Sequence, residues 1–223
     1  MVEAIRSYHA RRGRLSPNQR EALETLGPGL DLAQTSDPLD LDDEFGRVAP
    51  RTLEIGSGLG DTAIELAAAN PDRDYIAADV HTKGIARTLI LIQRTGLTNL
   101  RVLHADALDF LTRRAAQDSL REVLVFFPDP WPKARHNKRR LVRREFADAV
   151  VRTLETGGVL HLATDDREYA DAMRQVLAGE PLLEKVHDGA RITARPRTKY
   201  ELAGEREGRH AIDLLYVLRA AST

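Results

Sequence analysis

Segments typical of strands and segments typical of helices alternate along the chain from residue 51 onward. The expected strands cover 51–56, 74–80, 99–106, 122–129 and 158–165, and the expected helices cover 61–70, 84–96, 107–116, 143–154 and 167–178. Two further strands, 182–187 and 211–219, are joined by a long basic loop without a helix. Strands separated by crossover helices form parallel sheets. The sequence therefore predicts an α/β protein with a doubly wound, mostly parallel sheet, helices on both faces and an antiparallel C-terminal edge.

Residues 1–48 differ from the rest of the chain. They begin with a basic stretch that contains five arginines, Arg6, Arg11, Arg12, Arg14 and Arg20. A short helix is expected over 16–27, with Ser16 as its cap and Gly27 as its end. Residues 31–46 are acidic and are expected to form a surface connection. We therefore expect two parts: 1–48 as a basic arm and connection, mobile in part, and 49–223 as the main domain.

Composition limits the classes of function. Hydrophobic residues make up 42% and charged residues 30% of the 223 residues, which is typical of a globular protein with a core. There is no cysteine, which excludes disulfides and thiolate metal sites. No apolar run is long enough to cross a bilayer and the N-terminus has no apolar signal segment, so we expect a cytoplasmic protein. The formal net charge is −1, so any affinity for nucleic acid has to come from local clusters.

A glycine-rich turn, "LEIGSGLGD", follows the first expected strand of the main domain. Gly56, Gly58 and Gly60 let the backbone approach a ligand closely. Their spacing departs from the Gly-x-Gly-x-x-Gly of dinucleotide sites and suits a nucleoside without a pyrophosphate, such as S-adenosylmethionine. Glu54 would repel a phosphate and attract an amino group. The alternative is a tight strand–helix turn without a ligand, and a NAD-binding oxidoreductase is disfavoured by the spacing.

An acidic residue stands at the end of five expected strands. These residues are Glu54, Asp79, Asp106, Asp129 and Asp165. Ligands of open α/β sheets bind at the carboxyl ends of the strands, so the five acids are expected to converge on one crevice. There Asp79 is placed to accept hydrogen bonds from ribose hydroxyls, and Asp106 to meet an adenine amino group. The alternative for each acid is a helix cap.

The stretch "VFFPDPWPKARHNKRR" combines an acid, a tryptophan and a cluster of positive charge. Prolines on both sides stiffen the turn that holds Asp129. Residues 130–144 contain no acid, which favours contact with phosphates over a solvated helix face. Trp131 either stacks on a base or packs structurally. The histidines His81, His104 and His136 lie on different elements without metal-ligand spacing, so no metal site is expected.

Four motifs resemble those of a known family. They are "FFPDPWPKARHNKRR", "ATD" (163–165), "RPRTKYE" (195–201) and "RSYHARRGRLSPNQ" (6–19). With them the chain resembles the class I S-adenosylmethionine-dependent methyltransferases and, more narrowly, the bacterial tRNA (guanine-N7-)-methyltransferases. The resemblance implies a seven-stranded Rossmann-like sheet and a methyltransferase domain over 49–223. It also implies transfer of a methyl group from S-adenosylmethionine to N7 of guanine 46 in the variable loop of tRNA.

The resemblance also implies roles for individual residues. The residues expected to bind the cofactor are Glu54, Gly56, Gly58, Gly60, Asp79, Asp106 and Asp129. Asp129 is also the expected catalytic residue. Substrate binding falls on Lys133, Asp165, Thr198, Lys199, Tyr200 and Glu201. RNA contact falls on Arg135, His136, Asn137, Lys138, Arg139 and Arg140. The chain departs from the family pattern at three positions: Asp79 replaces a glutamate, Asp166 an aromatic residue and Tyr200 a phenylalanine.

The chemistry of guanine N7 sets the role expected for Asp129. N7 carries a free lone pair at neutral pH, so the reaction needs no general base. We expect Asp129 to accept hydrogen bonds from the N1–H and N2–H edge of guanine and to stabilise the positive charge on the purine. The base has to leave its stack to be reached. The alternatives are a methyltransferase for another RNA, a small molecule or a protein, and a non-catalytic RNA-binding protein. We expect a monomer or a homodimer with no obligatory protein partner.

Overall fold

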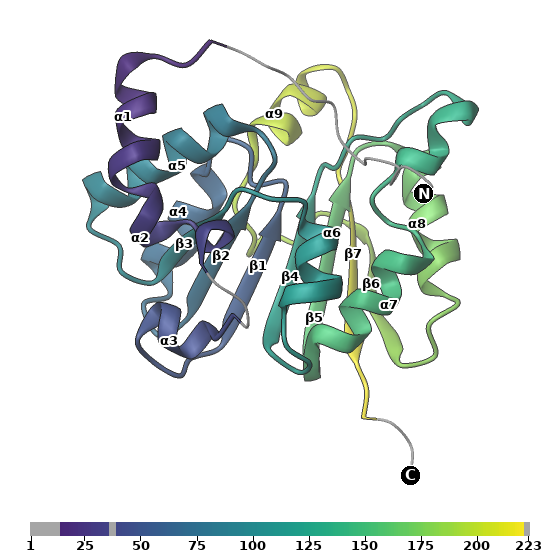
Figure 1. Ribbon diagram of the computed structural model, residues 1–223. Helices are drawn as coiled ribbons and strands as arrows, with labels where there is room; N and C mark the ends of the chain where they lie inside the picture. The colour runs from purple at the N-terminus through teal and green to yellow at the C-terminus, as the bar shows by residue number, and fades with distance from the viewer. Residues whose placement is uncertain (1–13, 36–38, 221–223) are drawn as a thin grey trace.

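The computed structural model of the protein describes residues 14–35 and 39–220. Within these ranges a seven-stranded sheet has the order β3–β2–β1–β4–β5–β7–β6 (Figure 1). Its strands are β1 (Arg51–Ile55), β2 (Asp74–Ala78), β3 (Leu100–Leu103), β4 (Leu120–Phe126), β5 (Leu154–Thr164), β6 (Leu183–Ala190) and β7 (Ile212–Leu218). All neighbouring pairs from β3 to β5 are parallel, whereas β7 is antiparallel to β5 and to β6. The predicted sheet with its antiparallel C-terminal edge is confirmed.

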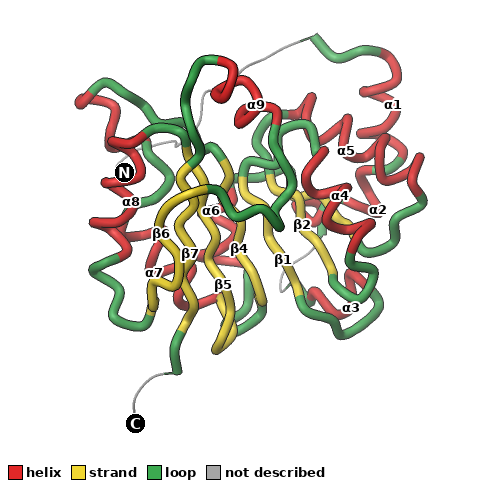
Figure 2. The backbone as a smooth tube through the Cα atoms, turned by 180° about the vertical axis from the view of Figure 1, so that it is seen from behind, coloured by secondary structure: helices red, strands yellow, loops and turns green. Residues whose placement is uncertain are grey.

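Helices cover both faces of the sheet, as Figures 1 and 2 show from opposite sides. One face carries α1 (Pro17–Thr25), α4 (Asp61–Ala69) and α5 (Thr82–Thr95). The opposite face carries α6 (Ala107–Asp109) with the π-helical turn η2 (Phe110–Arg114), α7 (Arg144–Thr153) and α8 (Arg167–Leu177). No helix of the described ranges is both long and apolar enough to cross a membrane.

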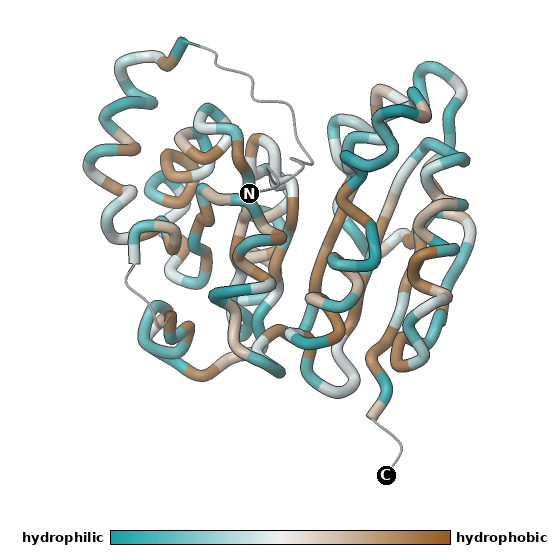
Figure 3. Tube along the Cα trace, turned by 45° about the vertical axis from the view of Figure 1, so that its right-hand side comes forward, coloured by the Kyte–Doolittle hydropathy of each residue, from teal (hydrophilic) through white to brown (hydrophobic). Residues whose placement is uncertain are grey.

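Alternation along the strands buries apolar side chains on both faces of the sheet. In β2, Tyr75 and Ala77 pack with the α1, α4 and α5 side, whereas Ile76 packs with the α6, α7 and α8 side. Hydrophobic residues follow the strands and the inner sides of the helices, and hydrophilic residues lie outside them (Figure 3). Because strands buried on both faces need apolar residues throughout, this arrangement explains their continuous apolar runs.

The acidic segment before the first strand is not a surface connection, and this prediction was wrong. After α2 (Gly27–Leu30), the described residues of this segment form the 3-10 turn η1 (Leu32–Gln34) and α3 (Leu41–Phe45). Leu32, Leu39 and Leu41 are buried in the larger core. Asp31 is also buried and accepts a hydrogen bond from the main chain of His104, 3.0 Å long. Apolar residues spaced between the acids anchor this segment to the sheet.

The basic loop before β7 and the N-terminal arm were also the subject of predictions. The long basic loop before β7 contains a helix, α9 (Lys199–Arg206), because Thr198 caps it by accepting a hydrogen bond from the main chain of Glu201. The basic stretch of the N-terminal arm up to residue 13, with Arg6, Arg11 and Arg12, lies outside the described residues. The division into an arm over 1–48 and a domain over 49–223 stays a prediction.

Candidate active site

The glycine turn after β1 adopts backbone conformations that side chains disfavour. Gly56, Gly58 and Gly60 have φ angles of 77°, 60° and 82°. Helix α5 packs directly against this turn: a Cβ on Gly84 would come within 2.0 Å of the main-chain oxygen of Gly58. Gly84 is therefore a fourth glycine that shapes the turn. Sequence reasoning missed it because it stands 24 residues further along the chain than Gly60.

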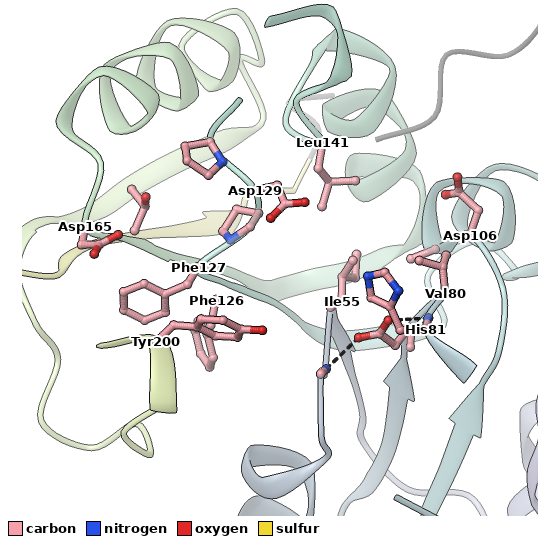
Figure 4. Close-up of a pocket in the computed structure, with 18 of the residues that line it drawn as sticks. Ile55, Val80, His81, Asp106, Phe126, Phe127, Asp129, Leu141, Asp165 and Tyr200 are labelled. Atoms are coloured by element: carbon pink, nitrogen blue, oxygen red, sulfur yellow. Dashed lines mark hydrogen bonds between the residues drawn. The ribbon is translucent and has the colours of Figure 1, made fainter. Parts of the chain in front are cut away.

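Asp79 at the end of β2 holds the glycine turn in place. Its two carboxylate oxygens accept hydrogen bonds from the main-chain N–H groups of Gly58, at 2.8 Å, and His81, at 2.7 Å (Figure 4). Each oxygen has a further lone pair. Asp79 therefore fixes the turn and still has acceptors for the ribose hydroxyls that the sequence assigned to it.

Glu54 is a buried carboxyl group with an unused oxygen. Its residue is 5% exposed, and Oε2 is buried without a hydrogen-bond partner in the described structure. Burial, together with the nearby charges of Asp79 and Asp61, raises the pKa of Glu54 to about 8. A buried polar atom without a partner is costly unless a ligand satisfies it. The amino group of S-adenosylmethionine is such a ligand, so Glu54 and the glycine turn fit that cofactor.

A cavity of about 410 Å³ opens at the carboxyl ends of the parallel strands. Four of the five predicted strand-end acids line it, namely Asp79, Asp106, Asp129 and Asp165. In Figure 4, Asp106 and His81 lie at one end of the cavity and Asp165 and Tyr200 at the other. Asp106 also caps α6, because it accepts a hydrogen bond of 2.9 Å from the main chain of Leu108. The common edge of the strands thus brings the predicted acids together.

The turn that carries Asp129 is held in an uncommon conformation. Phe127 and Trp131 have φ angles of 52° and 47°, and each precedes a proline. Left-handed conformations of bulky residues cost about 1–3 kcal/mol each and persist only where the surroundings impose them. The Asp129 residue is exposed, and its carboxylate accepts no hydrogen bond from any described residue. The turn therefore presents an unpaired carboxylate to the cavity.

Arg140 fastens this turn to the neighbouring helix. Its residue is 5% exposed. Nε donates a hydrogen bond of 2.8 Å to the main-chain oxygen of Pro130, and Nη2 donates one of 2.9 Å to Glu168 on α8. The guanidinium also lies over the ring of Tyr169, 5.0 Å from its centre. Arg140 was predicted to contact RNA, but its buried side chain is occupied within the protein, so the structure favours a supporting role for it.

The rest of the predicted RNA-contact segment lies on the surface. It forms the 3-10 helix η3 (Ala134–Arg139) directly after the turn. Lys133, Arg135 and Lys138 are exposed, and His136, Asn137 and Arg139 are half-buried. Trp131 is 5% exposed, and its ring packs against His136 and under the Arg139 guanidinium, at 5.7 Å and 4.9 Å. This burial favours the structural reading of Trp131 over stacking on a base.

A buried arginine ties α9 to the sheet. Arg195 donates two hydrogen bonds to Glu201, of 2.7 and 3.0 Å, and two to Asp213 on β7, of 2.8 and 2.9 Å. Its guanidinium lies 5.3 Å and 5.6 Å from the ring centres of Phe126 and Phe127. Burial alone would raise the pKa of the Asp213 carboxyl group, but hydrogen bonds from His161, Arg195 and the Ile192 main chain outweigh it and hold this pKa well below the ordinary range. The Arg195 guanidinium is therefore buried and fully occupied within the protein.

Helix α9 closes one end of the cavity. Tyr200 is exposed and lines the cavity near Phe127 and Asp165 (Figure 4). Lys199 is exposed with its Nζ 4.9 Å from the centre of the Tyr200 ring, whereas Glu201 is only 2% exposed. Asp165 Oδ2 accepts a hydrogen bond of 2.7 Å from Arg209. The structure therefore brings Asp165 and Tyr200 to the cavity, places Lys199 beside the Tyr200 ring and turns Glu201 inward.

Metal binding has no obvious location in the described part of the chain. No group of three or more His, Cys, Asp or Glu side chains there is arranged to hold a metal ion. Of the three histidines considered from the sequence, His81 lines the cavity, His104 shares a hydrogen bond with Thr82, and His136 packs on Trp131.

Comparisons with known structures agree with this fold. The antibiotic-resistance methyltransferase Kmr is similar with a TM-score of 0.60 and 16% identity, over 86% of this chain and 99% of that one. The N-methyltransferase NodS from Bradyrhizobium japonicum WM9, solved with S-adenosyl-L-homocysteine, is similar with a TM-score of 0.52 and 16% identity, over 92% of this chain and 89% of that one. Both likenesses place the sheet among class I methyltransferase folds.

Sequence comparisons are more specific. A family model described as "Putative methyltransferase" matches residues 48–214. A protein of Alkalilimnicola ehrlichii named tRNA (guanine-N(7)-)-methyltransferase is 46% identical over 95% of this chain and 92% of its own length. A protein of Idiomarina loihiensis with the same name is 42% identical over 100% of this chain and 92% of its own length. This chain therefore belongs to the family of the bacterial tRNA (guanine-N(7)-)-methyltransferases.

Proposed function

We propose that this protein transfers the methyl group of S-adenosylmethionine to N7 of a guanine in tRNA. The products are 7-methylguanosine in the tRNA and S-adenosylhomocysteine. The target that we propose is guanine 46 in the variable loop. One observation carries the proposal: Asp129 faces the cavity, between the glycine turn at one end and α9 at the other, with a carboxylate that no described residue pairs with. Family membership supports the reaction, and this geometry supports the role of the residue.

The cofactor belongs at the glycine-turn end of the cavity. There Glu54 Oε2 receives the amino group, Asp79 accepts from the ribose hydroxyls, and Asp106 accepts from the adenine amino group. Gly56, Gly58 and Gly60 allow the backbone to approach. When it is bound, S-adenosylmethionine supplies a methyl group on a positively charged sulfur, which an acidic pocket tolerates.

The protein acts on the guanine by orientation and electrostatics. N7 has a lone pair and no proton to lose, so no side chain has to act as a base. Asp129 accepts hydrogen bonds from N1–H and N2–H, a donor pair that the corresponding edge of adenine lacks. Its charge also stabilises the positive charge that the purine gains as the N7–carbon bond forms. Because the strained turn is fixed by Arg140, the carboxylate is positioned before the substrate arrives.

The substrate-binding residues divide into two groups. We propose that Lys133, Asp165, Lys199 and Tyr200 contact the nucleotide, and that Thr198 orders them by capping α9. Glu201 acts by holding α9 through Arg195, since its carboxylate is buried against that arginine. Arg135, His136, Asn137, Lys138 and Arg139 contact the RNA backbone. Arg140 supports the turn.

The alternative is a methyltransferase for another RNA or for a small molecule. The exposed cations Lys133, Arg135 and Lys138 beside the cavity favour a polyanionic substrate, because a small molecule needs no series of phosphate contacts. We also propose that the protein works in the cytoplasm as a monomer or a homodimer, with no obligatory protein partner. It needs no metal ion, because the sulfonium is already an activated methyl donor.

A single experiment tests this function. The protein is incubated with methyl-labelled S-adenosylmethionine and unmodified tRNA, and the product is cleaved with borohydride and aniline, which cut at 7-methylguanine. Label should enter the tRNA, and cleavage should occur at guanine 46 alone. Absence of label transfer would refute the function, and cleavage elsewhere would refute the assigned position. A tRNA with adenine at position 46 is the matched control.

A further inference from the structure

A second cavity adjoins the candidate active site. It has a volume of about 600 Å³ and shares two lining residues, Asp165 and Arg209, with the first cavity. Its remaining lining residues are Arg167, Gly189, Ala190, Gly208, His210, Ala211 and Ile212. The walls come from the start of α8, the end of β6 and the segment between α9 and β7. None of the motifs that identify the family includes Arg167 or His210.

Positive charge predominates in this groove. Arg167 and His210 are exposed, and neither forms a hydrogen bond or an ion pair with another described residue. Asp165 is the one acid among the lining residues, and it is already paired with Arg209 at 2.7 Å. Outside the lining, Glu207 also pairs with Arg209, and Asp166 caps α8. Among the described residues, Arg167 is therefore the unpaired cation of the groove, and His210 lines the same groove.

The groove is also open enough for a bulky ligand. A Cβ built on Gly189 or on Gly208 would have no atom within 4 Å. Figure 4 places Asp165, the shared residue, at the end of the cavity that Tyr200 occupies, away from Asp106. The groove therefore continues from the end where the guanine is proposed to enter, not from the cofactor end.

The size of the substrate requires a second phosphate-binding surface. The target nucleotide is linked through one phosphate to the nucleotide before it and through another to the nucleotide after it. The exposed cations after Asp129 provide a surface for the RNA backbone on one side. Four acids line the cavity that is proposed to hold the base, and its one arginine, Arg209, is paired with Asp165, so cations elsewhere are better placed to bind a second phosphate.

We propose that the groove around Arg167 and His210 is a phosphodiester site, which binds the backbone of a nucleotide next to the methylated guanine. The site rests on the proposed function, because its ligand is the same tRNA. The Arg167 guanidinium binds the phosphate oxygens in its planar fork, and His210 donates a hydrogen bond to the same phosphate or to the ribose. Arg209 and Asp165 line both this groove and the first cavity, where the guanine is proposed to bind.

Binding of unmodified tRNA in a salt series tests the groove. Replacing both residues, Arg167→Ala with His210→Ala, should weaken binding by roughly tenfold at physiological salt and make the slope of log affinity against log salt shallower by about one. Arg167→Lys should retain the slope, and Arg167→Glu should weaken binding more than the double replacement. The matched control is Arg94→Ala, because Arg94 is exposed in the last turn of α5 and has no partner among the described residues.

The groove and the proposed methyltransferase function are refuted by different results. Unchanged affinity and slope in the double variant, or equal affinities of the Arg167→Lys and Arg167→Glu variants, would refute the groove and leave the proposed function intact. Failure of the unaltered protein to methylate tRNA would refute the function, whatever the groove variants bind. The affinity for S-adenosylmethionine, measured in parallel, should be the same in all the variants. If the double variant does not fold, the comparison of lysine with glutamate at position 167 decides the matter alone.

Discussion

Arg140 donates a hydrogen bond of 2.8 Å from its Nε to the main-chain oxygen of Pro130, one residue after Asp129. The same guanidinium is bound to Glu168 and packed on Tyr169, both on α8. A residue at the end of the basic run therefore controls the turn that presents the acid. We therefore propose that Arg140 contributes to catalysis by positioning the turn and not by contacting RNA.

Replacement of Arg140 separates these two roles. Arg140→Lys keeps the charge but loses the fork that reaches Pro130 and Glu168 together, so the turn should become less fixed. We expect kcat to fall roughly tenfold or more, because misplacement of a catalytic group by about 1 Å costs up to ~100-fold. The salt slope of tRNA binding should not change. An unchanged kcat in Arg140→Ala, together with a shallower slope of log tRNA affinity against log salt, would mean that Arg140 contacts phosphate. Lys138→Ala is the control, because Lys138 is proposed to contact the RNA backbone.

Replacement of Asp129 tests the acid itself. Asp129→Asn retains the shape of the side chain but removes its charge and puts a donor where an acceptor is needed. Loss of a group that stabilises charge in the transition state costs ~100- to 1000-fold in kcat, so a fall of this size is expected. Binding of S-adenosylmethionine, followed by calorimetry, should remain measurable, because Glu54, Asp79 and Asp106 are unchanged. Near-normal turnover of this variant would rule out the role given to Asp129.

Glu54 should make cofactor binding depend on pH. Because the pKa of Glu54 is about 8, the carboxyl group of the empty protein is mostly neutral at pH 7. The ammonium group of the cofactor needs the ionised form, so binding should release a proton. The affinity for S-adenosylmethionine should therefore rise with pH, by up to about tenfold per unit below the pKa, and level off above it. Glu54→Gln should bind more weakly at pH 8 and should lack this dependence; a wild-type affinity that is flat from pH 6 to pH 8 would contradict the assignment.

The same group affects the folding stability. The pKa of Glu54 is about 8 in the folded protein against an ordinary value of 4.5. Its proton therefore contributes stability that is fully present below about pH 4.5 and is lost as the pH rises through about 8. The wild type should therefore lose stability as the pH rises from 5 to 8, whereas Glu54→Gln should not. The free energy of unfolding of the variant minus that of the wild type should increase over this range, as measured by urea denaturation without cofactor. If the difference in free energy of unfolding between Glu54→Gln and the wild type is the same at pH 5 and at pH 8, the pKa of Glu54 is not raised in the folded protein.

Arg195 is expected to be needed for stability. Its side chain is 4% exposed and is bound to two buried carboxylates. Removing one partner of a buried ion pair costs about 3–5 kcal/mol, so Arg195→Ala should lower the free energy of unfolding by that amount and Tm by roughly 10 °C. Arg197→Ala is the control: Arg197 pairs with Glu205 at the surface, and such pairs contribute about 0–1 kcal/mol. Equal effects of the two replacements would contradict the structural role of Arg195.

The strand-end acids were predictable, whereas their supports were not. Asp79, Asp106 and Asp129 stand at the ends of predicted strands, and parallel strands bring their carboxyl ends to one edge, so the pattern alone locates them at the cavity. Glu54 lies within β1 and is buried beside the glycine turn. Arg140 and Arg195 look like any other members of basic stretches. Their burial depends on Glu168, Glu201 and Asp213, which lie 28, 6 and 18 residues away along the chain.

Three local features were also beyond the sequence patterns. The segment with Leu32 and Leu41 reads as acidic surface because its acids are numerous, and only the tertiary fold shows that its leucines are buried. Helix α9 is short, and its cap, Thr198, stands within a basic loop where proline and arginine hide the helical signal. Gly84 becomes important only because α5 crosses close to Gly58.

The proposed contact between Asp129 and the 2-amino group of guanine can be removed from the side of the substrate. A tRNA with inosine at position 46 keeps N7 and N1–H but lacks that amino group. The wild type should methylate this tRNA with a kcat/KM lower by roughly 10- to 100-fold, the value of a hydrogen bond to a charged group, whereas Asp129→Asn should discriminate little between the two tRNAs. Equal kcat/KM of the wild type for guanine and inosine, or equal discrimination by both proteins, would contradict the account.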